Sequence, residues 1–301
     1  MEPAVLETSA ERASARRVEL LALGAALVTV VLWSSAFVGI RSAGTAFSAG
    51  PLTLGRLLVA SVALGGVALM RGASRPRRGD VVPLLVCGLA WFGLYNIALN
   101  EAEHRIDAGT ASMLVNVGPI LIAILAGTLL GEGFPRGLVL GCVVAFSGAI
   151  VIGLATSGDG LAAGWGTALC VFAAFAYACG IIAQKPLLAR MSALDVTWLA
   201  CGIGTIACLP FAPALVRQMG DAEPSKIAWI VYLGAFPTAI AFTTWAWALA
   251  RTPAGRLGST TYLVPPIAIV LGWAILGETP PLVAIGGGAL CVAGAAIARR
   301  R

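Results

Sequence analysis

The stretch GPILIAILAGTLLGEGFP at residues 118–135 is repeated as VPPIAIVLGWAILGETPP at residues 264–281, without a gap and at an offset of 146 positions. Both copies place a proline near the start of an apolar run, end the run with Leu-Gly-Glu and add a proline three residues later. Identical residues continue at the same offset, from Gly109 and Gly255 to Gly148 and Gly294. The chain therefore contains an internal duplication.

The composition is that of a membrane protein. Of the 301 residues, 59% are hydrophobic and 11% are charged, whereas a soluble domain carries about 25% charged residues. Apolar runs of about 20 residues can cross a bilayer as helices. Ten such runs form two sets of five, and they predict an all-α integral membrane fold with helices at residues 18–40, 51–70, 81–99, 109–130, 136–154, 163–183, 193–216, 227–250, 254–276 and 281–298.

Basic residues sort onto alternate loops and so predict the orientation of the ten helices. Cytoplasmic loops of membrane proteins are enriched in Lys and Arg. If the N-terminus is cytoplasmic, fifteen of the 20 basic residues face the cytoplasm and Arg56 lies within a span; the four that face outward are Arg41, Arg105, Arg217 and Lys226. Both termini are therefore predicted to be cytoplasmic.

The two sets of helices predict two inverted repeats, because an odd number of helices in each set reverses the second relative to the first. We expect a cytoplasmic tail at residues 1–17, which lacks the apolar core of a cleaved signal peptide. A first five-helix repeat follows at 18–155 and a second, inverted one at 163–298. Inverted repeats around a site near the bilayer midplane are typical of secondary carriers that work by alternating access.

Short motifs along the chain resemble those of the drug/metabolite transporter superfamily, specifically its EamA-type carriers. They are Trp33-Ser-Ser-Ala-Phe, Gly50-Pro51 with Arg56-Leu-Leu, Tyr95-Asn96-Ile-Ala-Leu-Asn100, and Pro119 to Glu132 with its repeat at Pro265 to Glu278. The resemblance covers nearly the whole chain. It implies a multi-pass carrier of the bacterial inner membrane that exports amino acids or other small metabolites, similar to amino-acid exporters of the YddG kind.

Polar residues inside predicted spans are candidates for the substrate site, since they cost free energy unless they meet a partner or a wet cavity. Asn96 and Asn100 share one face of the third helix; they either bind substrate or join helices. Arg56 either snorkels to the membrane surface, pairs helices or holds a substrate carboxylate. Of these readings of Arg56, the sequence favours a snorkelled or helix-pairing group.

Prolines mark two symmetry-related helices as predicted hinges. Pro119 in the first repeat, and Pro265 and Pro266 in the second, remove backbone N–H groups from helical turns. The carbonyl groups that this frees must find partners or line a cavity. Ser112 and Asn116 lie just ahead of the first break and are predicted substrate contacts.

Aromatic residues near the inner parts of the spans complete the predicted substrate pocket. They are Trp33, Tyr95, Tyr177, Trp245 and Tyr262. Trp33 and Tyr177 occupy corresponding places in the first helix of each repeat. Pockets lined by aromatic side chains favour apolar or aromatic ligands, so hydrophobic or aromatic amino acids are the favoured substrates.

Several functions are disfavoured by what the sequence lacks. All fourteen acidic residues lie in tails, loops or helix ends, which weakens the alternative of a proton-coupled drug or metabolite carrier. No GxxxxGK[ST] motif occurs, which excludes direct drive by ATP. One loop histidine, His104, and scattered acids argue against a metal site and an enzyme acting on lipids. We expect no cofactor or nucleic acid, only a small-molecule substrate and membrane lipid; a monomer is compatible with the sequence, which leaves the oligomeric state open.

Overall fold

The structure is a computed structural model that describes residues 9–105, 111, 114–156, 164–276 and 282–299. The regular structure in these ranges is entirely helical. The helices of the first half are α1 (Ser9–Ala43), α2 (Ala49–Met70), η1 (Arg78–Asp80), α3 (Val81–Val86), η2 (Cys87–Tyr95), α4 (Asn96–Glu103), α6 (Gly118–Leu129) and α7 (Arg136–Thr156). Those of the second half are α8 (Trp165–Leu187), α9 (Ala193–Cys208), η3 (Leu209–Phe211), α10 (Ala212–Asp221), α11 (Pro224–Leu233), η4 (Gly234–Ile240), α12 (Ala241–Leu249), α13 (Ala254–Gly258), η5 (Ser259–Leu263), α14 (Val264–Leu276) and α15 (Leu282–Arg299).

Within the described ranges, seven continuous helical stretches are long and apolar enough to cross a membrane. They are Arg16–Ala43, Ala49–Met70, Arg78–Glu103, Trp165–Leu187, Ala193–Asp221, Pro224–Leu249 and Ala254–Ile275. Three shorter apolar helices accompany them, at Gly118–Leu129, Arg136–Ile152 and Ile285–Arg299. Many large apolar side chains point outward, among them Leu282 and Met70 at 83% and 81% exposure. Lipid suits such a surface, whereas a soluble monomer rarely exposes so much apolar area.

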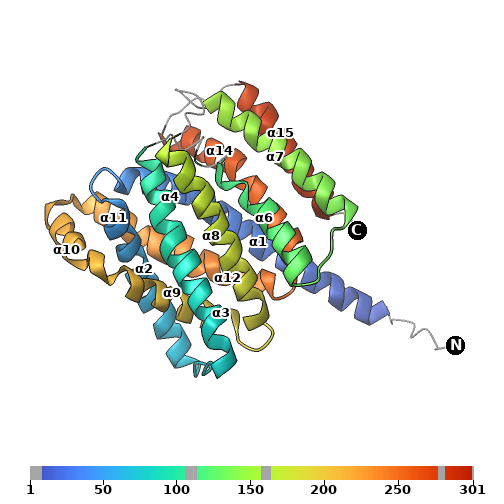
Figure 1. Ribbon diagram of the computed structural model, residues 1–301, viewed down its shortest axis with the longest axis horizontal. Helices are drawn as coiled ribbons and strands as arrows, with labels where there is room; N and C mark the ends of the chain where they lie inside the picture. Colours follow the sequence, from blue (N-terminus) through green and yellow to red (C-terminus); the bar gives the residue numbers. More distant parts are fainter. Residues whose placement is uncertain (1–8, 106–110, 112–113, 157–163, 277–281, 300–301) are drawn as a thin grey trace.

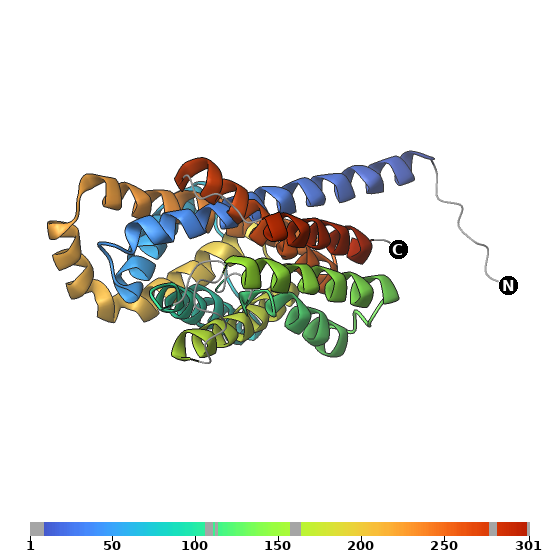
Figure 2. The same cartoon turned by 90° about the horizontal axis from the view of Figure 1, so that it is seen from above.

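Helices α7 and α15 lie side by side at one edge of the bundle (Figures 1 and 2). A methyl group added at Gly148 would lie 2.5 Å from the carbonyl oxygen of Gly287, and one added at Gly294 would lie 2.6 Å from that of Gly141. These glycines are counterparts at the repeat offset of 146. The contacts are thus reciprocal, and they run in opposite directions along the two helices. A two-fold rotation therefore relates this antiparallel pair.

The helices of the two halves interlock at the centre of the molecule. Helix α1 packs against α12 and α14, while α8, its counterpart, packs against η2, α4 and α6. Thr29 Oγ1 on α1 lies 2.8 Å from Thr244 Oγ1 on α12. Ser34 Oγ donates to the carbonyl oxygen of Val264 over 3.2 Å. The central core is consequently shared between the two halves.

The third helix of each half contains a π-helical segment, η2 in the first and η4 in the second. Adding 146 to the residue numbers of η2 gives 233–241, which encloses η4. π-Helices are rare and are frequent at functional sites. The sequence predicted uninterrupted helices here, and it ended the first of them at Leu99. The helix instead reaches Glu103, because Leu99 and Ala102 remain buried against neighbouring helices.

Pro119, a predicted hinge, lies in the first turn of α6, and the predicted hinges Pro265 and Pro266 lie where the 3-10 helix η5 passes into α14. Helix α6 begins one residue before Pro119, and α14 begins one residue before Pro265 and Pro266. Residues 116–117 form a turn ahead of the first, and η5 is a 3-10 helix ahead of the second. A proline in the first turn of an α-helix removes no hydrogen bond of that helix, because the N–H groups of the first turn have no partner within it. The two helices are therefore interrupted at related places, and hinge motion there stays a prediction.

One end of the bundle joins four loops through polar contacts. Arg190 pairs with Asp80, and Lys185 Nζ donates to the carbonyl oxygens of Leu249 and Thr252 over 2.5 and 2.6 Å. Glu132 accepts hydrogen bonds from the backbone N–H groups that begin α13, Ala254 at 2.6 Å and Gly255 at 3.0 Å. Glu132 therefore caps the start of α13, while its repeat counterpart Glu278 lies outside the described residues.

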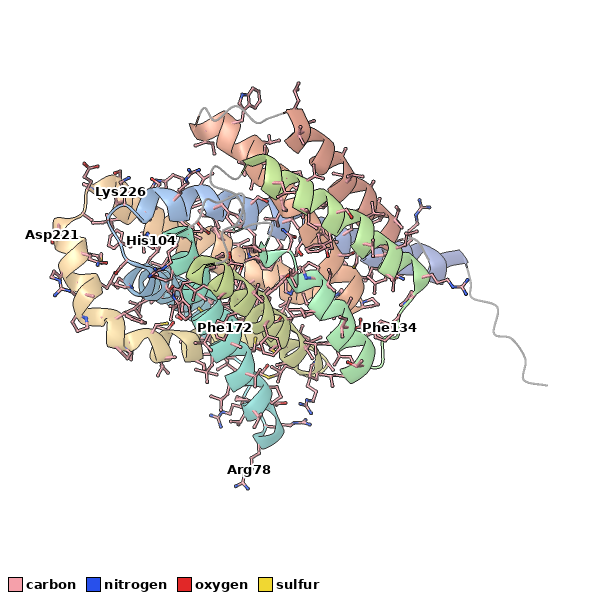
Figure 3. All side chains as sticks on the ribbon, turned by 45° about the horizontal axis from the view of Figure 1, so that its top comes forward. Arg78, His104, Phe134, Phe172, Asp221 and Lys226 are labelled. Atoms are coloured by element: carbon pink, nitrogen blue, oxygen red, sulfur yellow. The ribbon has the colours of Figure 1, made fainter. Side chains whose placement is uncertain are left out.

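The opposite end carries a different group of loops. Figure 3 shows Arg78 at one extremity of the molecule, with His104, Asp221 and Lys226 towards the other. Gln218 Nε2 donates to Ser48 Oγ over 3.0 Å, which ties the end of α10 to the start of α2. The loop with four arginines after α2 and its counterpart before α11 thus lie at opposite ends of the bundle.

Candidate substrate cavity

A cavity with about 670 Å³ of empty space, counting the part that opens outward, lies between the two halves. Its aromatic lining comes from both halves: Trp33, Phe37, Trp91, Tyr95, Tyr177 and Phe242. Its polar lining is Arg56, Asn96, Asn116 and Thr261. The wall combines large apolar surfaces with a few polar groups, as in sites for small organic molecules.

An aromatic cluster forms one wall of the cavity and continues behind it; it comprises Trp33, Trp91, Phe92, Tyr95, Tyr177, Phe242 and Trp245. The ring of Trp33 lies 5.4 Å from that of Phe242, and Phe242 lies 4.7 Å from Trp91. Tyr95 and Tyr177 are 5.7 Å apart. Rings at such separations attract each other by about 0.5–1.5 kcal/mol per pair beyond area burial. The cluster joins η2, α1, α8 and α12 into one surface.

Asn96 holds the end of the first π-helical segment. Its Nδ2 donates to the carbonyl oxygens of Trp91 and Phe92 over 3.1 and 3.0 Å. Both acceptors are carbonyl groups, so the nitrogen must face them and Oδ1 must point elsewhere. The side chain is 2% exposed and lines the cavity. Asn96 therefore supports the π-helical backbone as well as contributing to the wall.

Arg56 is buried at the cavity wall rather than extended to the membrane surface. The residue is 4% exposed, and its Nε donates to Thr238 Oγ1 on η4 over 3.0 Å. Thr238 Oγ1 in turn donates to the carbonyl oxygen of Leu233 over 2.8 Å. Pro237 leaves that carbonyl without its usual helical N–H partner. The prediction that Arg56 snorkels to the membrane surface is wrong, because the packing of α2 against η4 encloses the guanidinium.

The structure brings together five of the residues that the sequence predicted as substrate contacts: Trp33, Tyr95, Asn96, Asn116 and Tyr177 line the cavity. Their contact with a substrate stays a prediction. Ser112 lies outside the described residues.

Three other predicted substrate residues are not at the cavity wall, because helix packing turns them elsewhere. Asn100 Nδ2 donates to Thr53 Oγ1 over 3.0 Å and so joins α4 to α2. Trp245 is 0% exposed and lies behind Trp33, with the two rings 5.0 Å apart. Tyr262 is 0% exposed and packs in a separate cluster that includes Cys142.

Sequence reasoning missed Trp91, Phe242, Phe37 and Thr261 at the wall. The repeat offers a signal for one of them, since adding 146 to Asn96 gives Phe242. The duplication therefore makes Phe242 the counterpart of Asn96 in the third helix of the second repeat.

Comparison with known proteins agrees with this architecture. The EamA-like transporter family matches twice, at residues 20–154 and 164–300. A probable terminal-alkyne amino-acid exporter of Streptantibioticus cattleyicolor is 40% identical over 282 residues, 93% of this chain and 94% of that protein. A probable amino-acid metabolite efflux pump of Salmonella typhimurium is 26% identical over 279 residues, 89% and 91% of the two chains.

A crystal structure of another protein shares the fold, with a TM-score of 0.77 and 23% sequence identity. The matched region covers 92% of this chain and 96% of the other. The repeated family match, the 40% identical relative and the apolar helices together identify a multi-pass membrane transporter. The chain belongs to the EamA-like transporter family.

Proposed function

We propose that this protein is a secondary carrier that exports amino acids with apolar or aromatic side chains across the cytoplasmic membrane. The observation that carries the proposal is the aromatic-walled cavity between the two halves. A relative with 40% identity is named as a probable exporter of terminal-alkyne amino acids. A terminal alkyne is a compact apolar group, which fits a wall built from indole and phenyl rings.

We further propose ten membrane spans in two inverted repeats, residues 18–155 and 163–298, with both termini in the cytoplasm. Reciprocal antiparallel contacts between α7 and α15 support the inversion, because a two-fold axis across the helix direction exchanges the repeats. Loops rich in basic residues meet at the end that holds Asp80 and Arg190. The positive-inside rule makes that end cytoplasmic.

Alternating access follows from this arrangement. In carriers with inverted repeats, exchange of the two repeats' conformations moves the opening from one side to the other. Breaks in the helices at residues 116–117 and at η5, and the paired π-helical segments, are the candidate flexible points. The cycle uses the substrate's own gradient, needs no ATP and involves no chemical conversion of the substrate.

One observation favours the alternative, a carrier coupled to protons. Both carboxyl oxygens of Glu103, at the end of α4, are buried without a hydrogen-bond partner in the described part of the chain. The charge of Glu103 interacts with those of Arg56 and Arg41. A carboxylate in such surroundings is suited to binding and releasing a proton as the cavity changes state.

Counterflow in liposomes tests the proposal. Purified protein is reconstituted with unlabelled leucine, phenylalanine or propargylglycine inside, and uptake of the labelled compound is followed against protein-free liposomes. We expect exchange without an imposed ion gradient. Exchange that requires a pH gradient would favour the alternative, and absence of exchange with every amino acid would contradict amino-acid export.

A further inference from the structure

We propose that Arg56 binds the carboxylate group of the transported amino acid, an inference that rests on the proposed function. Arg56 stands on the third turn of α2 and reaches the cavity, where it is the one charged residue among the described lining residues. A single positive charge matches a monoanion such as a carboxylate. The site therefore selects substrates by the group that all amino acids share.

Burial of Arg56 calls for a counter-charge, and no carboxylate in the described part of the chain pairs with it. A buried charge is costly unless it is paired or faces a wet cavity. Within the described residues no carboxylate forms an ion pair with the guanidinium. Glu103 acts on it only through a longer-range electrostatic interaction. A substrate anion in the cavity would supply the missing partner.

The hydrogen bonds of Arg56 leave its outer edge available. In the described part of the chain, the guanidinium makes one hydrogen bond, from Nε to Thr238 Oγ1. Its two terminal nitrogens carry four further N–H donors. Two parallel bonds from these nitrogens to a carboxylate form the bidentate geometry for which arginine is best suited.

The orientation of the guanidinium is set by the second repeat. Thr238 gives its only hydroxyl hydrogen to Leu233 O, so its oxygen can only accept from Arg56. Pro237 lacks the N–H group that would pair with the Leu233 carbonyl in an α-helix, so the Thr238 hydroxyl meets less competition at that oxygen. The guanidinium is therefore fixed on one side before substrate arrives, which lowers the entropic cost of binding.

The apolar wall lies in the same cavity as this cation. Trp33, Tyr95 and Phe242 line it together with Arg56. A carboxylate bound at Arg56 leaves the substrate's side chain to occupy the aromatic part of the cavity. The two features together predict recognition of an apolar amino acid in preference to the amine or ester of the same side chain.

The test compares labelled leucine and phenylalanine with their methyl esters and decarboxylated amines, in counterflow with the wild type and with Arg56→Gln and Arg56→Lys. We expect the wild type to exchange the acids and to discriminate against the esters and amines. Arg56→Gln should raise the half-saturation concentration for the acids about ten- to a hundredfold, the effect of losing charge-assisted hydrogen bonds, and should lose the discrimination. Arg56→Lys should recover part of the affinity, since a point charge attracts a carboxylate without the bidentate geometry.

Arg217→Gln, on the exposed face of α10, is the matched control for loss of an arginine and should behave as the wild type. Competition of esters and amines against acids on the wild type tests the inference even if Arg56→Gln fails to fold. Equal transport of acids, esters and amines, or unchanged affinity in a folded Arg56→Gln, would overturn the inference and leave the carrier function standing. If the wild type exchanges none of the three classes, both the proposed substrate and the inference are overturned.

Discussion

Arg56 on α2 and Thr238 on η4 are joined by a hydrogen bond of 3.0 Å that links the second helix of one repeat to the third helix of the other. Thr238 also closes the break that Pro237 makes in its own helix, by donating to Leu233 O. One hydroxyl thus couples a helix interruption to the only charged group among the described residues of the cavity wall. Any movement of η4 relative to α2 would change the position of that charge.

Replacing Thr238 with valine tests this coupling. Thr238→Val keeps the shape of the side chain but removes the acceptor for Arg56 and the donor for Leu233. A buried group left unpaired costs about 1–3 kcal/mol, so we expect a lower unfolding temperature and a higher half-saturation concentration in counterflow. Thr238→Ser should restore both. The control is Thr243→Val, which removes a hydroxyl that donates only to the carbonyl oxygen of Ala239. If Thr243→Val lowered stability and affinity as much as Thr238→Val, Thr238 would have no specific role.

Trp33 connects the cavity to the rings behind it. Trp33→Ala would remove its contacts with Trp91, Phe242 and Trp245 and would enlarge the cavity. We expect the half-saturation concentration for leucine to rise about tenfold, which corresponds to about 1.4 kcal/mol, and the preference to move towards larger side chains. The control is Trp273→Ala, whose ring is exposed on α14. Unchanged counterflow kinetics and selectivity in Trp33→Ala would remove Trp33 from the proposed substrate site.

Asn96 is expected to stabilise the π-helical backbone of η2. Asn96→Leu leaves the carbonyl groups of Trp91 and Phe92 without their side-chain donor, at a cost of about 1–3 kcal/mol, so unfolding temperature and transport should fall together. Ser147→Ala also removes a side-chain bond to a helical carbonyl, but at an exposed position, and should change neither. If Asn96→Leu retained full stability, the π-helical segment would not depend on this amide.

The sequence predicts the helices far better than it predicts the residues that meet between them. Apolar runs and loop charges locate helices such as α2, predicted at 51–70 and found at Ala49–Met70. The π-helical segments leave no such trace, because both kinds of helix are built from the same apolar residue types. Burial of Arg56 depends on η4, which is 182 positions away along the chain at Thr238. Trp245 and Tyr262 show the same limit, since only the packed structure decides which face of a helix meets the cavity.

The close packing of α7 and α15 predicts a strong contrast between two neighbouring glycines. A methyl group at Gly287 would lie 2.8 Å from the carbonyl oxygen of Gly148 and 2.9 Å from Cγ1 of Ile152, whereas one at Gly286 would meet nothing within 4 Å. Overpacking of this kind costs about 1–3 kcal/mol. Gly287→Ala should therefore lower the unfolding temperature in detergent, while Gly286→Ala should leave it unchanged or raise it. Equal effects would mean that the two helices are further apart than described.

Opposite placement of two loops makes the inverted topology testable with single cysteines. Ser74, after α2, and Ser225, at the start of α11, are both exposed, and inversion of the repeats puts them on different sides of the membrane. We expect a membrane-impermeant maleimide to label Ser225→Cys in intact cells and Ser74→Cys only after the membrane is permeabilised. Six of the seven native cysteines are buried and Cys179 is partly buried. The protein without an introduced cysteine should therefore react little with the maleimide, and it serves as the control. Labelling of both positions from the same side would contradict the inversion. Reversed labelling would keep the inverted repeats but place both termini outside, against the distribution of basic residues.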